Sequence, residues 1–84
     1  MGQVGADSAD ERVVRIGSRV RVRDEDGEDE FALVPHRDAD AMADRVSVES
    51  PIGRALLGHR VGDRVRFRAP GGIVGVTVVS VRMQ

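Results

Sequence analysis

One short helix with both of its ends encoded constrains this 84-residue chain more than any other feature. The hydroxyl of Ser50 can cap the first turn, and Pro51 suits the first helical position because its missing N–H has no partner there. Gly58 is a natural left-handed terminator, so the helix has only about two turns and depends on tertiary packing. Gly53 weakens the first turn, which indicates that another part of the chain packs closely against that position.

Most of the remaining chain alternates between apolar and polar residues, which is typical of half-buried strands. The pair Asp26-Gly27 predicts a hairpin turn between the first two strands, since glycine accepts the positive φ of a tight turn. In the last strand the apolar parity changes near Val78, which predicts a β-bulge or a sharp bend. Gly75 in the same strand predicts a neighbour that covers its face closely. The expected strands are residues 19–23, 28–34, 45–49, 64–68 and 73–83.

These elements predict an α+β domain, in which an antiparallel sheet of about five strands carries one short helix on one face. The chain is long enough for one small core, and without cysteine no disulfide can supplement that core. Residues 1–12 are small and polar without periodicity, so we expect a disordered tail before a single domain at residues 13–84. No apolar run approaches the length of a membrane span, and no signal-peptide pattern opens the chain, which favours a cytoplasmic protein.

The charges predict a ladder of ion pairs on the first hairpin. Arg19, Arg21 and Arg23 alternate along one strand, and Glu28, Asp29 and Glu30 lie on its expected partner, so opposite charges should meet across the strands. The formal net charge is −1, yet the first 44 residues hold six arginines against twelve acidic residues, and the last 40 hold seven against two. This asymmetry favours electrostatic orientation on a partner, unless the two halves interleave in the fold and their charges average out.

Several classes of chemistry lack the residues they need. Phe31 and Phe67 are the only aromatic residues, which argues against base stacking, and thus against direct sequence-specific binding of nucleic acid. His36 and His59 have no cysteine partner, and a zinc site would need two further ligands. The acidic cluster at 24–30 could offer oxygen ligands to a divalent cation, but its spacing is not that of an EF-hand loop, and a solvated hairpin tip is the better interpretation. We therefore expect no catalytic residue, no metal and no cofactor.

An ordered series of motifs resembles the C-terminal domain of the GreA/GreB transcript-cleavage factors. The series covers most of the chain from Ile16 onward, and its order and gaps make it more specific than any single short motif. Its core is the block Ser-Pro-x-Gly-x-Ala-Leu-Leu-Gly at residues 50–58. The other matching motifs are Ile16-Gly17-Ser18, Asp26-Gly27, Asp38-Ala39-Asp40, Val61-Gly62-Asp63 and Pro70-Gly71-Gly72.

The resemblance implies an FKBP-like fold that docks on RNA polymerase at the rim of its secondary channel. In that family the catalytic acids lie on a long N-terminal coiled coil, for which 84 residues leave no room. We therefore expect a stand-alone, non-enzymatic module that modulates transcription elongation without transcript cleavage. The alternatives are a small prolyl isomerase of FKBP type, whose activity would depend on an aromatic-lined pocket, or half of a split Gre-type factor. An exposed edge strand would allow a weak dimer as well as a monomer.

Docking on the polymerase is expected from the loop before the third strand, the start of the helix and the residues after it. A ten-residue loop is long for a compact domain, which favours a functional role. Helix capping alone is the competing explanation for Ser50 and Pro51. The candidate partner-binding residues are Asp38, Asp40, Asp44, Ser50, Pro51, Arg54, His59 and Arg60.

Overall fold

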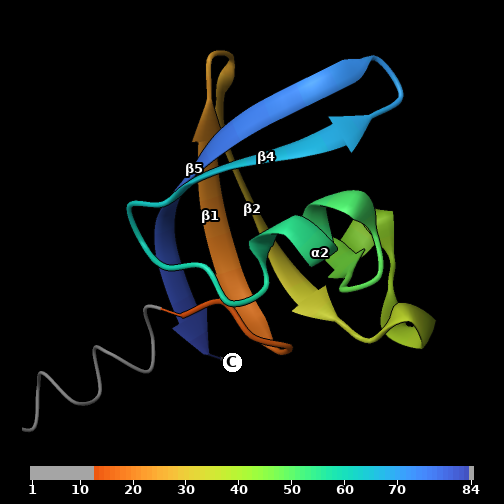
Figure 1. Cartoon of the computed structure of the whole chain (residues 1–84). Coiled ribbons are helices and arrows are strands. Elements are labelled where there is room, and N and C mark those ends of the chain that lie inside the picture. The colour runs from red at the N-terminus through yellow and green to blue at the C-terminus, as the bar shows by residue number, and fades with distance from the viewer. Residues whose placement is uncertain (1–12, 84) are drawn as a thin grey trace, which may run out of the picture.

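The computed structural model describes residues 13–83, so the predicted tail at residues 1–12 lies outside the described residues, as does Gln84. Within these residues, five strands form one curled sheet in the order β3-β2-β1-β5-β4, and the sheet curls around helix α2 (Figure 1). The strands are β1 (Ser18–Asp24), β2 (Gly27–Val34), β3 (Arg45–Ser47), β4 (Arg64–Ala69) and β5 (Gly72–Met83). The helices are η1 (His36–Asp38), η2 (Ala41–Ala43) and α2 (Pro51–Leu56).

The predicted hairpin joins β1 to β2 through a two-residue turn. Asp24 pairs with Gly27. The φ of Gly27 is 137°, a backbone conformation that residues other than glycine rarely adopt. The glycine therefore has the role that the sequence indicated. All other neighbouring strands are also antiparallel except β2 and β3, which run parallel because the loop at residues 35–44 carries the chain back before β3 begins.

Strand β5 connects the two halves of the sheet, and the predicted bulge lies within it. Val22 of β1 pairs with Val78, but the preceding Arg21 pairs with Ser80, so Val79 is the extra residue. The expectation for Gly75 is wrong, because nothing lies within 4 Å of a β-carbon placed there. Gly75 is exposed and pairs with the exposed Arg66, which places it on the outer face of the sheet.

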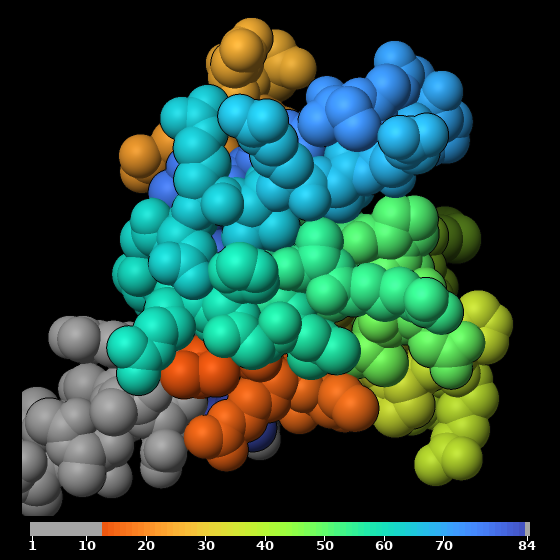
Figure 2. All heavy atoms as spheres, viewed as in Figure 1, coloured from red at the N-terminus to blue at the C-terminus, as the bar shows by residue number. Residues whose placement is uncertain are grey.

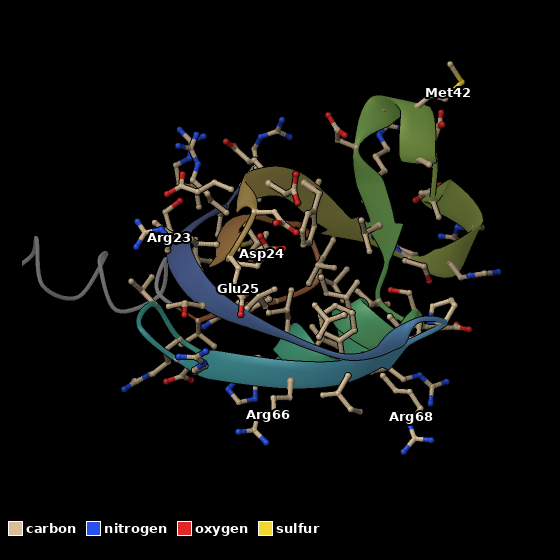
Figure 3. The ribbon with its side chains drawn as sticks, turned by 90° about the horizontal axis from the view of Figure 1, so that it is seen from above. Arg23, Asp24, Glu25, Met42, Arg66 and Arg68 are labelled. Atoms are coloured by element: carbon tan, nitrogen blue, oxygen red, sulfur yellow. The ribbon has the colours of Figure 1, made fainter. Side chains whose placement is uncertain are left out.

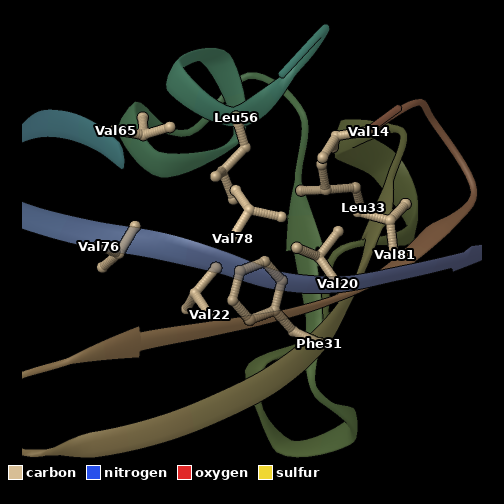
Figure 4. Close-up of a cluster of buried hydrophobic side chains, with 10 residues drawn as sticks. All are labelled: Val14, Val20, Val22, Phe31, Leu33, Leu56, Val65, Val76, Val78 and Val81. Carbon is tan, nitrogen blue, oxygen red and sulfur yellow. The ribbon is translucent and has the colours of Figure 1, made fainter. Parts of the chain in front are cut away.

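The hydrophobic core fills the space between the inner face of the sheet and α2. Leu56 of α2 is fully buried and lies near Val78 of β5 in the close-up of this cluster (Figure 4). Val14, which the alternating pattern did not include, is also 1% exposed. Its backbone N–H donates to the carbonyl of His59, and its own carbonyl accepts from Gly58, so the segment before β1 is tied to the end of the helix.

Helix α2 has the predicted capped start. The Ser50 hydroxyl accepts a hydrogen bond from the backbone N–H of Gly53 at 3.1 Å, and Pro51 occupies the first turn. Gly58 has the expected positive φ, at 85°. The space-filling view shows α2 and the connector after it, coloured green to teal, between the β4–β5 hairpin and the first described residues (Figure 2). No helix within residues 13–83 is long and apolar enough to cross a membrane.

Candidate partner-binding surface

A groove of about 310 Å³ opens on the inner side of the sheet, where the first hairpin, β5, α2 and the loop before β3 meet. Its floor is apolar. Phe31 and Val76 are buried there, whereas Phe67, Val74 and Ile52 are half-buried and offer accessible apolar surface. The two aromatic residues thus lie on inward faces, as the strand pattern predicted.

The rim of this groove is acidic. Asp24, Asp29 and Asp44 all line it, and none of the three forms an ion pair with another residue of the described chain. The prediction that Asp29 joins the charge ladder is wrong, because it pairs with the inward-facing Val22 and so lies on the inner side. An apolar floor with a carboxylate rim suits a protein segment that carries an apolar side chain flanked by positive charges.

The loop at residues 35–44 is held in a defined shape beside the groove. The Asp40 side chain accepts from the Met42 N–H at 3.1 Å, and the Asp40 backbone exchanges two hydrogen bonds with Arg45, both 2.9 Å long. The His36 ring lies 3.1 Å from the Ser47 hydroxyl. Asp38 is exposed in η1. Asp40 therefore has a structural role, whereas Asp38 presents its side chain to solvent.

Met42 lies in the same loop but was not among the candidate partner-binding residues. Its side chain is 97% exposed and projects away from the sheet at the tip of the loop (Figure 3). Methionine is enriched in protein interfaces, so an exposed methionine on an ordered turn is a natural contact residue. The sequence contains the signal, because Met42 is the one large apolar side chain in an otherwise small and polar loop.

The start of α2 completes this side of the molecule. The Ser50 hydroxyl donates to the Ser47 carbonyl at 2.7 Å while it accepts from Gly53, so its hydrogen-bonding capacity serves the fold. Pro51 and Arg54 are exposed. The Arg54 Nε donates to the Glu49 carbonyl at 3.0 Å, which fixes the side chain while the rest of its guanidinium remains available.

Comparison with known proteins decides the family. The family described as "Transcription elongation factor, GreA/GreB, C-term" matches residues 9–83. The chain belongs to this family. It is 46% identical over 71 residues to the transcription elongation factor GreA of Rhodospirillum rubrum, covering 82% of this chain and 45% of that protein. The chain therefore spans about half the length of the curated relatives it matches.

Solved structures of the family show the same fold. The GreA/GreB factor of Nitrosomonas europaea has a TM-score of 0.71 and 36% identity, covering 86% of this chain and 62% of that one. GreA factor homolog 1 (Gfh1) of Thermus thermophilus has a TM-score of 0.73 and 32% identity, covering 83% of this chain and 48% of that one. The FKBP-like arrangement of this Gre C-terminal domain is thereby confirmed.

The last two candidates, His59 and Arg60, lie apart from the others in this Gre domain. Both belong to the connector between α2 and β4, which leaves the helix at the end opposite the loop at residues 35–44 (Figure 1). The Asp63 carboxylate accepts from the Arg60 N–H and lies 2.9 Å from the His59 Nδ1, and these hydrogen bonds hold the pKa of Asp63 below its usual range. The structure therefore divides the candidate set into two groups.

The charge ladder of the first hairpin lies on the outer face of the sheet. Arg19 and Arg21 bind Glu30 at 2.8 and 2.7 Å, and Arg23 binds Glu28 at 3.1 Å, which confirms the ladder for these two acids. Hydrogen bonds, the strongest from Arg21, lower the pKa of Glu30 to about 2.

Within residues 13–83, no group of three or more histidine or acidic side chains is placed to hold a metal ion.

Proposed function

We propose that this Gre-family domain binds RNA polymerase through one docking face and modulates transcription elongation without cleaving RNA itself. The docking face consists of the groove, the loop at residues 35–44 and the exposed start of α2. The observation that carries the proposal is the groove, which combines an apolar floor with three carboxylates that have no ion-pair partner among the described residues. The family match supports the choice of partner, and a polymerase partner would place the protein in the cytoplasm.

The docking face supplies two kinds of interaction. The apolar floor and the exposed Met42 would bury surface against the polymerase, which contributes affinity. The carboxylates of Asp24, Asp29 and Asp44 would orient a positively charged segment and accelerate its association, an effect that salt should weaken. Asp38, Pro51 and Arg54 extend the face along the loop and the helix, whereas His59 and Arg60 would form a separate contact.

The absence of cleavage is proposed for these 84 residues on two grounds. They match the C-terminal domain of the family, whereas the resemblance places the catalytic acids of Gre factors on the N-terminal coiled coil. The described acidic residues also form no group that suits a metal ion. Modulation would then follow from occupancy of the site that full-length Gre factors use.

The test is a titration of the purified chain against core RNA polymerase free of nucleic acid, with a full-length Gre-type factor as competitor. We expect saturable binding that the competitor displaces. Arg54→Glu removes the free guanidinium donors that Arg54 would offer to the polymerase, and it should weaken binding by about tenfold or more, which corresponds to about 1.4 kcal/mol. Arg66→Glu is the matched control, because it makes the same charge reversal on the outer face of the sheet.

Four results would overturn parts of the proposal. Binding that the competitor leaves unchanged would place the domain on another polymerase surface, and no saturable binding would remove the polymerase as partner. Stimulation of transcript cleavage in stalled elongation complexes by the chain alone would contradict the non-cleaving role. Equal effects of Arg54→Glu and Arg66→Glu would show that the docking face is misplaced.

A further inference from the structure

A row of three arginines lies along the outer face of edge strand β4. Arg64, Arg66 and Arg68 alternate with the inward-facing Val65 and Phe67, and all three arginines are exposed. Arg66 and Arg68 project away from the sheet on the side opposite α2 (Figure 3). We call these three residues the β4 Arg row. None of them forms an ion pair or a side-chain hydrogen bond with another residue of the described chain.

The same pattern on β1 shows what a purely structural row looks like. Arg19, Arg21 and Arg23 face Glu28 and Glu30 on the next strand and are paired with them. The β4 Arg row has no such partners, since the residues that pair with it on β5 are Thr77, Gly75 and Ile73. Its positive charges are therefore not neutralised by the strand beside them.

The acidic tip of the first hairpin lies beside β5, where Asp24, Glu25 and Asp26 line a depression together with Ile73, Val74 and Gly75. Asp24 and Glu25 line a shallow depression together with Arg64, without forming an ion pair to it. Arg66 and Arg68 are not part of that depression. Of the three arginines, Arg64 is thus the one that shares a depression with the acidic tip.

We propose that the β4 Arg row binds the phosphate backbone of a nucleic acid, separately from the docking face for the polymerase. Alternate residues of a strand recur about every 6.6–6.8 Å, so the three arginines are evenly spaced along β4. Such an even spacing suits the repeating phosphates of a nucleic acid, and the planar guanidinium fork matches phosphate oxygens. A local patch is needed because the whole chain, with a net charge of −1, does not attract polyanions.

The surroundings of the β4 Arg row favour a backbone ligand over other anionic partners. Both aromatic residues, Phe31 and Phe67, face inward, so the outer face offers bases no aromatic side chain to stack on, and contacts to phosphates alone carry no sequence information. A membrane surface would need a broad apolar face beside the charges, whereas the residues facing the row on β5 offer only Ile73 as a large apolar side chain. The expected binding is weak, sequence-independent and strongly dependent on salt.

The experiment measures the fluorescence anisotropy of labelled oligothymidylate and of a labelled duplex, each about 20 units long, as the full chain is added in about 50 mM and about 200 mM salt. Three phosphate contacts predict a slope of log affinity against log salt of about −2.1 for the single strand and about −2.7 for the duplex. Affinity for the single strand should then fall about 20-fold between the two salt concentrations. The two probes show which form of the backbone is preferred.

Variants at the centre of each row provide a matched comparison. Arg66→Gln should weaken binding and make the slope shallower by about 0.7 for the single strand, because one phosphate contact is lost. Arg21→Gln removes the same charge from the middle of the β1 row, where the Arg21 guanidinium is already held by Glu28 and Glu30, and should leave binding unchanged. The triple variant Arg64→Gln, Arg66→Gln, Arg68→Gln should lose the salt-dependent binding altogether.

Several outcomes would overturn this inference. They are no binding at low salt, equal losses for Arg66→Gln and Arg21→Gln, or equal displacement by polyglutamate, which would indicate a general polyanion surface. Binding to phosphatidylserine vesicles without binding to either oligonucleotide would point to a membrane instead. Thermal unfolding of each variant checks that the fold is intact, and the triple variant should still bind core polymerase free of nucleic acid, so the two proposals fail independently.

Discussion

The α-carbon of Gly53 lies so close to the carbonyl oxygen of Ser47 that a β-carbon at position 53 would overlap this oxygen. The next atom in its way would be the Val48 α-carbon, at 2.8 Å. Both obstacles belong to the backbone and cannot rotate aside as a side chain would. This contact sets the start of α2 against the end of β3, and it thereby fixes the two elements that flank the docking face.

Replacing Gly53 with alanine should therefore destabilise the domain. Alanine is favoured over glycine in a helix interior by about 1 kcal/mol, but forcing a methyl group into packed backbone typically costs about 1–3 kcal/mol. We expect the cost to exceed the gain in a urea denaturation experiment. Gly71→Ala is the control, since its position is open and its φ is not positive, and it should change stability by less than about 0.5 kcal/mol. A Gly53→Ala variant as stable as the wild type would refute the close contact.

The Ser50 hydroxyl makes two hydrogen bonds within the domain. Substitutions can show whether Ser50 only stabilises the fold or also contacts the polymerase. Ser50→Ala removes the bond to the Gly53 N–H and the bond to the Ser47 carbonyl, so stability should fall by about 1 kcal/mol. Ser50→Thr keeps a hydroxyl and should recover most of this loss. Polymerase affinity, measured where both variants are fully folded, should be unchanged if Ser50 acts only as a cap. A loss of affinity in the folded Ser50→Ala variant would instead give Ser50 a direct contact.

The features that could be predicted from the sequence are those that depend on neighbours in the chain. The capped helix, the turn at Asp26-Gly27 and the change of parity near Val78 each rest on local residue types, and the structure has all three. The close approach to Gly53 could also be predicted, because a glycine that weakens a short helix indicates that another part of the chain packs closely there. The same reasoning failed for Gly75, because an exposed outer face tolerates a glycine without a neighbour.

Features that depend on how strands meet could not be predicted in the same way. The parallel pairing of β3 with β2 depends on the path of a loop whose two short helices left no periodic signal. Asp29 faces the groove instead of the arginines because the register places it beside Val22. The contrast between the two arginine rows has the same origin. Both alternate identically in sequence, and only the neighbouring strand determines which row forms ion pairs.

The ladder around Glu30 gives the domain a dependence on acid that can be measured. Hydrogen bonds from Arg21, Arg19 and Arg82 lower the pKa of Glu30 from 4.5 to about 2 in the folded state. Between these values the unfolded chain binds a proton that the folded chain does not, so stability rises with pH. The contribution is complete above about pH 4.5 and is lost as the pH falls through about 2.

Glu30→Gln should therefore flatten the dependence of the melting temperature on pH between about pH 2 and 4.5. Glu25→Gln is the control, because Glu25 lies in the turn and forms no ion pair with the described residues. About 1 M salt should reduce the difference between wild type and Glu30→Gln, since the ladder is largely exposed and screened by ions. Identical pH profiles for the wild type and Glu30→Gln at low salt would contradict the assigned pKa.

Asp44 allows the docking face to be tested without disturbing the fold. It has a φ of 55°, the left-handed region that asparagine tolerates as well as aspartate, and its carboxylate makes no hydrogen bond or ion pair with the described residues. Asp44→Asn should keep stability within about 0.5 kcal/mol, yet weaken binding to core polymerase at low salt because one rim charge is lost. Asp44→Val serves as a control for backbone strain. It should destabilise the domain by about 1–2 kcal/mol, since a β-branched side chain is strained in the left-handed conformation. Unchanged polymerase affinity in a fully folded Asp44→Asn variant would remove the acidic rim from the docking face.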